Sequence, residues 1–208
     1  QGGPGMGDGT RVYVIEGVAG SGKDTLARQL VASLLPDARP VLVWDETAVL
    51  ASWHHYYLPD IDRLRLDLTE SLAGHTEATL QREPDTLFVF NRLHVSHAVW
   101  RAEKRHDLPE LEVRHDRLVQ RLAALGTLVL HPVLDITSLE QRTSHNERQE
   151  AAWRAFLQRR AADMGSPSPG QMYGDQQSAM QRVLTRDGLP WRALSVVPGQ
   201  SVDLRGVV

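Results

Sequence analysis

The chain of 208 residues has 41% hydrophobic and 24% charged residues, a composition that is ordinary for a globular protein. Its net charge of −3 argues against a broadly basic nucleic-acid-binding surface but leaves room for a local basic patch. The sequence has no cysteine, which excludes a disulfide framework and thiol chemistry.

The domain organisation is expected to be simple. No apolar run approaches the roughly 20 residues of a membrane span, and no secretory hydrophobic region opens the chain. We therefore expect a cytoplasmic protein without a membrane partner. Residues 1–5 read as a cloning remnant and Met6 as the natural start. A single domain is expected over residues 6–208, with a small lid at about residues 140–150.

A glycine-rich stretch at residues 17–25 has the pattern of a phosphate-binding loop. It follows an apolar run at 12–15 and precedes a helix-like run at 26–35, which is the strand–turn–helix context that such a loop requires. Its backbone N–H groups and the positive end of the helix attract phosphate, and Lys23 can reach the β- and γ-phosphates. The predicted ATP-binding residues are Gly17, Val18, Ala19, Gly20, Ser21, Gly22, Lys23, Asp24 and Thr25.

The position after the lysine departs from the usual pattern. Serine or threonine normally stands there and helps to hold Mg²⁺, whereas this chain has Asp24 followed by Thr25. We expect Thr25 and Asp24 to be the residues that hold the metal.

Further apolar runs at 41–44, 87–90, 127–131 and 193–197 predict four more strands. Helical patterns lie between them. Leu64, Leu68 and Leu72 recur every four residues and predict a buried helix face, which Gly74 interrupts weakly. Strands that alternate with helices predict a three-layer α/β/α fold with a five-stranded parallel sheet.

Polar residues follow two of these strands. Asp45 and Glu46 end the second, and Asn91 and Arg92 end the third. Ligands of open α/β sheets bind beyond the carboxyl ends of the strands, so these side chains are placed to meet substrate or phosphate. Capping of the following helix is an equally good interpretation for either carboxylate.

Two other stretches allow more than one interpretation. The aromatic cluster at residues 53–57 either stacks on a flat substrate or covers the core. Arg142 and Arg148 flank a polar loop, which is typical of a lid that closes on polyphosphate. We interpret Arg154, Arg159 and Arg160 as charges on a solvated helix face.

Three motifs in this order resemble the thymidylate kinase branch of the P-loop nucleoside and nucleotide kinases, over roughly residues 11–157. The phosphate loop is the first. The second begins at Asn91-Arg92 with Ser96, similar to the family's Asp-Arg-Tyr-x-x-Ser, with Asn91 in place of the acid. The third is Glu-Arg-Gln-Glu at 147–150 followed by Phe156, which resembles the family's lid, with Arg142 at the place of the arginine before it.

The resemblance implies a P-loop NTPase fold of the nucleotide kinase type and ATP-dependent transfer of the γ-phosphoryl group, with ATP and Mg²⁺ as cofactors. The implied acceptor is a nucleotide, a nucleoside or a nucleoside-like compound. A pyrimidine is favoured, and modified bases or a base within DNA are included. Arg92, Arg142 and Arg148 would neutralise phosphoryl charge, and Asp45 or Glu46 would take the proton of a hydroxyl acceptor. A homodimer is also implied.

The acceptor side departs from the family pattern. Asp45-Glu46-Thr47 stands where the family has Glu-Pro-Gly, and the acid–arginine pair before His75 is absent. Two alternatives therefore stay open. One is a P-loop kinase for an unrelated small metabolite or antibiotic, and the other is a nucleotide-binding regulator without catalysis.

Overall fold

The structure, a computed structural model, describes residues 9–37, 39–104, 108–144, 151–197 and 200–207. Its centre is a five-stranded parallel sheet, as predicted, and its strand order is β2-β3-β1-β4-β5. The strands are β1 (Val12–Ile15), β2 (Val41–Trp44), β3 (Leu87–Asn91), β4 (Thr127–Val133) and β5 (Trp191–Ser195).

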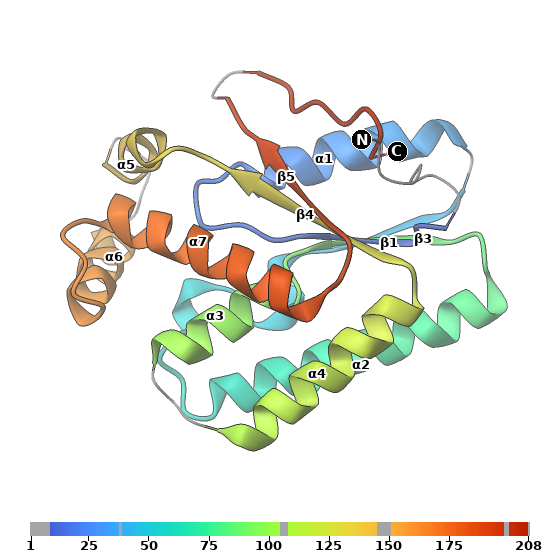
Figure 1. Cartoon of the computed structure of the whole chain (residues 1–208), viewed down its shortest axis with the longest axis horizontal. Coiled ribbons are helices and arrows are strands. Elements are labelled where there is room, and N and C mark those ends of the chain that lie inside the picture. Colours follow the sequence, from blue (N-terminus) through green and yellow to red (C-terminus); the bar gives the residue numbers. More distant parts are fainter. Residues whose placement is uncertain (1–8, 38, 105–107, 145–150, 198–199, 208) are drawn as a thin grey trace.

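Helices cover both faces of this sheet (Figure 1). Helix α1 lies on one face, α2, α3, α4 and α7 lie on the other, and α5 and α6 lie at one end of the molecule. The predicted α/β/α arrangement is therefore confirmed. The helices are α1 (Lys23–Leu34), α2 (Ile61–Arg82), α3 (Val95–Glu103), α4 (Pro109–Ala124), α5 (Ile136–Ser144), α6 (Ala151–Asp163) and α7 (Pro169–Asp187). Over the described ranges, none of the helices combines the length and the apolar character that crossing a bilayer requires.

The strand order fixes where a ligand can bind. After β1 the chain passes over β3 to form the edge strand β2, and it later returns through β3 before crossing to β4 on the other side of β1. The carboxyl ends of β1 and β3 therefore lie side by side at the point where the strand order reverses. In open α/β sheets this is where ligands bind, and it is where the phosphate loop and Asn91-Arg92 both begin.

Helix α2 corrects one expectation. It runs without interruption through Gly74, and its buried face differs from the predicted one: Leu64 is 45% exposed, whereas Leu66, Ala73 and the charged Arg65 are buried. Packing against α3 and α4 selects the face, and the leucine spacing alone could not reveal it.

A buried carboxylate joins the two strands that carry the site. Glu16, the last residue before the phosphate loop, is 0% exposed. Its Oε1 accepts hydrogen bonds from the backbone N–H groups of Leu93, His94 and Val95 at 2.9, 2.8 and 2.9 Å. Its Oε2 accepts from the Ser96 N–H at 3.2 Å and from the Ser96 hydroxyl at 2.5 Å. An anion at a helix N-terminus satisfies N–H groups that have no partner within the helix, so Glu16 holds the start of α3 against the end of β1.

We predict that Glu16→Gln lowers the free energy of unfolding by about 2–4 kcal/mol, because the amide NH₂ would face the Ser96 donors and the charge would be lost. Urea denaturation followed by circular dichroism measures this. The control is Glu83→Gln, whose exposed side chain should change stability by less than about 0.5 kcal/mol. Equal stability of the two variants would contradict the role of Glu16.

Candidate active site

The phosphate loop curls at the carboxyl end of β1. Gly20 and Gly22 adopt φ angles of 78° and 87°, which side-chain-bearing residues rarely reach, and Gly22 caps α1. The Lys23 side chain is largely buried at the first position of that helix. Its Nζ lies 3.3 Å from Glu46 Oε2 and 3.7 Å from Asp24 Oδ1. The ammonium group therefore lies between the carboxylate next to it on α1 and the carboxylate that follows β2.

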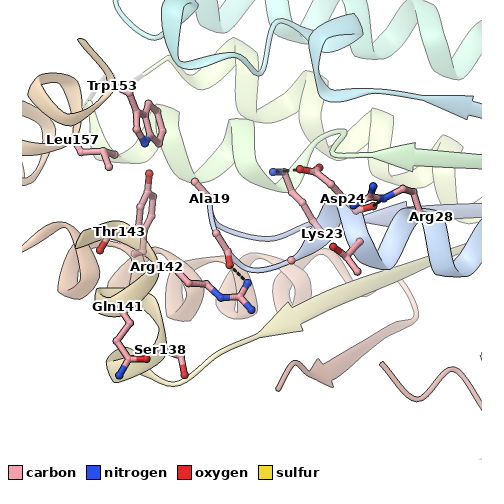
Figure 2. A pocket seen from close by; sticks show the side chains of 14 residues that line it. Ala19, Lys23, Asp24, Arg28, Ser138, Gln141, Arg142, Thr143, Trp153 and Leu157 are labelled. Atoms are coloured by element: carbon pink, nitrogen blue, oxygen red, sulfur yellow. Dashed lines mark hydrogen bonds and ion pairs between the residues drawn. The ribbon is translucent and has the colours of Figure 1, made fainter. Parts of the chain in front are cut away.

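A cleft of about 550 Å³ opens in front of the loop. Figure 2 shows that α5 and α6 contribute side chains to it, among them Arg142 and Trp153, opposite Lys23 and Asp24 of the loop. Thr25 also lines the cleft. The structure thus brings six of the nine predicted loop residues, Ala19, Gly20, Gly22, Lys23, Asp24 and Thr25, to one space of the size that small-molecule sites have, whereas Gly17 and the buried Val18 and Ser21 do not line it.

Asp24 and Asn91 contact each other across the switch point. The Asn91 Nδ2 donates a hydrogen bond of 2.7 Å to Asp24 Oδ1. Although burial alone would raise it, the neighbouring Lys23 charge and the Asn91 hydrogen bond lower the pKa of Asp24 below its usual value. The carboxylate is therefore ionised at neutral pH. In this chain the acid stands on the loop, and the end of β3 supplies an amide that orients it.

Arg92 is held in a strained backbone conformation. Its φ is 79°, a region that few residues other than glycine adopt. The side chain is 4% exposed, with Nε donating to Glu46 Oε2 at 3.1 Å and Nη1 donating to Ser96 Oγ at 3.0 Å. Because the Ser96 hydroxyl in turn donates to Glu16, the guanidinium is fixed by a chain of contacts that ends in the buried carboxylate. Backbone strain of this kind often accompanies functional sites.

The two candidate carboxylates after β2 are separated by the structure. Glu46 faces inward and lies beside Lys23 and Arg92. Asp45 is exposed and lines a different groove, between α1 and the β2 edge. Of the two predicted bases, Glu46 is the one close to the loop lysine.

The lid region is described only in part. Arg142, on α5, reaches the loop and donates from Nη1 to the Gly20 carbonyl oxygen. Arg148 and the rest of residues 145–150 lie outside the described residues, so the role of Arg148 stays a prediction. Helix α5, which carries Arg142, is capped by Asp135, whose carboxylate accepts a hydrogen bond from the Ser138 N–H at 2.8 Å.

A second cavity, of about 110 Å³, lies on the other side of Lys23 from the cleft in front of the loop. We call the first space the loop cleft and the second the aromatic cavity. Trp53 and Tyr56 of the predicted aromatic cluster line it, together with Trp100, Trp153 and Phe156. It shares Ala19, Lys23, Trp153 and Tyr173 with the loop cleft, so the two spaces adjoin. The core interpretation of the cluster is confirmed for Tyr56, which is 6% exposed, while Trp53 and Tyr56 also line the cavity, so stacking on a substrate stays a prediction.

Two arginines of this cavity were missed or misread in the sequence. Arg65 sits on the buried face of α2. Arg160, interpreted above as solvated, is 4% exposed, and its Nη2 donates to Glu103 Oε2 at 2.5 Å. In the sequence, Arg160 lies four residues after Phe156 and directly before Ala161, two residues that are buried in the structure. This helical spacing is the sequence feature that could have indicated that Arg160 is buried.

The fold and the phosphate loop define the class of the protein: it has a P-loop fold of the nucleotide kinase type. No protein-family model and no curated protein matches the sequence. Among solved structures, thymidylate kinase from Candida albicans is similar at a TM-score of 0.57 and 17% identity, covering 95% of this chain and 88% of the other. Deoxyadenosine kinase from M. mycoides with bound dCTP aligns at a TM-score of 0.48 and 11% identity, covering 88% and 89%. The first likeness supports the fold.

The strain at Arg92 gives a test in which two variants lose the same guanidinium. We predict that Arg92→Gly is more stable than Arg92→Ala by about 1 kcal/mol, because glycine adopts the positive φ without penalty. Urea denaturation of both measures the difference. At Arg101, inside α3, the order should reverse, with the glycine variant less stable by about 1 kcal/mol. An Arg92→Gly variant that is no more stable than Arg92→Ala would contradict strain at Arg92.

Proposed function

We propose that this protein is a phosphotransferase that moves the γ-phosphoryl group of ATP to a nucleotide or a nucleoside-like acceptor. The observation that carries the proposal is the meeting of Lys23, Glu46 and Arg92 at the border between the loop cleft and the aromatic cavity. These residues come from α1, the turn after β2 and the turn after β3. Such a junction suits a donor phosphate on one side and an acceptor on the other.

In the proposed reaction, the bond between the γ-phosphorus and the oxygen that bridges it to the β-phosphate breaks as the acceptor oxygen bonds to phosphorus. The loop N–H groups and Lys23 would hold the β- and γ-phosphates, and Arg92 and Arg142 would stabilise the negative charge that spreads over the transferring group. For a hydroxyl acceptor, Glu46 would take the proton, and for a phosphate acceptor no base is required.

The described residues fit a magnesium ion that is carried mainly by the nucleotide. They contain no cluster of three or more histidine, aspartate or glutamate side chains that could hold a metal alone. Mg²⁺ is usually bound through one or two protein groups together with substrate phosphates and water, and Thr25 and the ionised Asp24 would supply those groups. When bound, the ion would neutralise charge on the β- and γ-phosphates.

The first test of the proposal is Lys23→Ala. We predict at least a 100-fold loss of acceptor-dependent ADP formation with an unchanged circular dichroism spectrum, because the ammonium group would stabilise charge in the transition state. Coupled detection of ADP measures the rate. The control is Arg82→Ala at the exposed end of α2, which should keep full activity. Full activity of Lys23→Ala would refute the proposed site.

The acceptor class is tested by incubating the wild-type protein and MgATP with nucleosides, nucleoside monophosphates, oligonucleotides and aminoglycoside-type metabolites. Mass spectrometry should find a gain of one phosphate on a nucleoside-type compound. Phosphorylation of a compound unrelated to nucleosides would replace the acceptor part of the proposal. Tight ATP binding without transfer to any of the four classes would support a regulator instead.

A further inference from the structure

The cavity beside Lys23 is unusually rich in positive charge for a space walled by aromatic rings. Among the described residues that line it, four are cationic, Lys23, Arg65, Arg92 and Arg160, whereas Glu46 is the single carboxylate. Asp62 and Glu103 do not line the cavity: Asp62 lies 3.4 Å from Lys104 Nζ, and Glu103 accepts from Arg160. The surface that faces the cavity is therefore cationic.

Arg65 has the most unsatisfied hydrogen-bond donors of these groups. Its side chain is 0% exposed, and Nε donates to the Leu50 carbonyl oxygen at 3.0 Å. Nη1 lies 3.8 Å from Asp62 Oδ1, beyond hydrogen-bonding distance, and neither Nη1 nor Nη2 has a hydrogen-bond partner among the described residues. Burial lowers the pKa of Arg65 to about 10, so it is still charged at neutral pH. A buried charge with unsatisfied donors is costly unless a partner binds it.

The guanidinium groups of Arg92 and Arg160 place further positive charge near Arg65. The central carbons of Arg65, Arg92 and Arg160 lie 4.6, 5.1 and 5.7 Å from the ring centre of Trp100. The ring face attracts each cation, and like charges around one indole repel each other. Arg92 and Arg160 each have a carboxylate partner, Glu46 and Glu103, whereas the nearest carboxylate oxygen to Arg65 is 3.8 Å away. Arg160 Nε is also buried without a hydrogen-bond partner.

Two neutral polar groups in the same wall are also buried. Gln176 Nε2 is a buried donor, and the Tyr173 hydroxyl can donate or accept; both lack a partner among the described residues. Both belong to α7, outside every motif seen in the sequence. The wall therefore suits a ligand with several acceptor oxygens, with flat surfaces that match the aromatic rings.

We infer that the acceptor enters this cavity as an anion, a nucleoside monophosphate rather than a neutral nucleoside, and that Arg65 and Arg160 bind its negative charge. This inference rests on the proposed function. The volume of about 110 Å³ suits one part of such a compound, and the adjoining loop cleft has room for the rest. A neutral nucleoside offers no charge to the buried guanidinium of Arg65, whose Nη1 and Nη2 lack hydrogen-bond partners among the described residues, whereas a phosphate accepts from several N–H groups at once.

The test compares matched pairs: thymidine with dTMP, deoxycytidine with dCMP, deoxyadenosine with dAMP and deoxyguanosine with dGMP. Each is titrated by calorimetry into the wild-type protein with magnesium and a non-hydrolysable ATP analogue. For at least one pair, the monophosphate should bind at least 30-fold more tightly than its nucleoside, as expected for a desolvated charge pair.

Arg65→Gln should then weaken binding of that monophosphate at least 10-fold and change nucleoside binding less than twofold. The matched control is Arg63→Gln on the exposed side of the same helix, which should change neither. Arg160→Gln provides an independent second variant should Arg65→Gln fail to fold. Retained monophosphate affinity in a folded Arg65 or Arg160 variant overturns the assignment of that residue.

Failure of the inference differs from failure of the proposed function. Equal or tighter binding of the nucleoside in every pair, with phosphate transfer to a nucleoside, overturns the anionic acceptor and leaves the kinase proposal intact. No binding of the ATP analogue and no transfer to any member of the pairs overturns both.

Discussion

The site depends on one buried carboxylate. Glu16 follows β1 immediately before the phosphate loop and accepts hydrogen bonds from four consecutive backbone N–H groups at the start of α3. It thereby fixes the distance between the loop and the turn that carries Arg92. A charged hydrogen-bond acceptor buried among N–H donors is rigid, because any movement would leave both sides unsatisfied. The strained φ of Arg92 can be maintained because this anchor holds the following residues in place.

Charge organises the rest of the site around that anchor. Lys23 and Arg92 meet at Glu46, and Asn91 orients Asp24 on the other side of the loop. The parallel sheet makes this possible, since the ends of β1, β2 and β3 all lie at one edge. Helices α2, α6 and α7 then add aromatic rings, amides and guanidinium groups, and so create the adjoining cavity. The proposed division into a donor side and an acceptor side follows from this layout.

The sequence was sufficient for local features and insufficient for long-range ones. The apolar runs predicted the strands, and the glycine spacing with Lys23 predicted the loop, because both signals lie within a few residues. Glu16 could not be found in this way, since its partners lie 77–80 residues further along the chain. The leucine spacing on α2 indicated the wrong face, Arg65 was not singled out, and Arg160 was interpreted as an ordinary surface charge. Their burial depends on helices packing together, which residue spacing does not encode.

The most direct test of the central claim is a crystal structure of the protein with magnesium and a non-hydrolysable ATP analogue. The account predicts that oxygens of the β- and γ-phosphates lie within hydrogen-bonding distance of the amides of residues 17–25 and of Lys23 Nζ. It also predicts that the terminal phosphate faces Arg92 and Glu46. An analogue seated away from the loop, or with its terminal phosphate turned away from the aromatic cavity, would contradict the account.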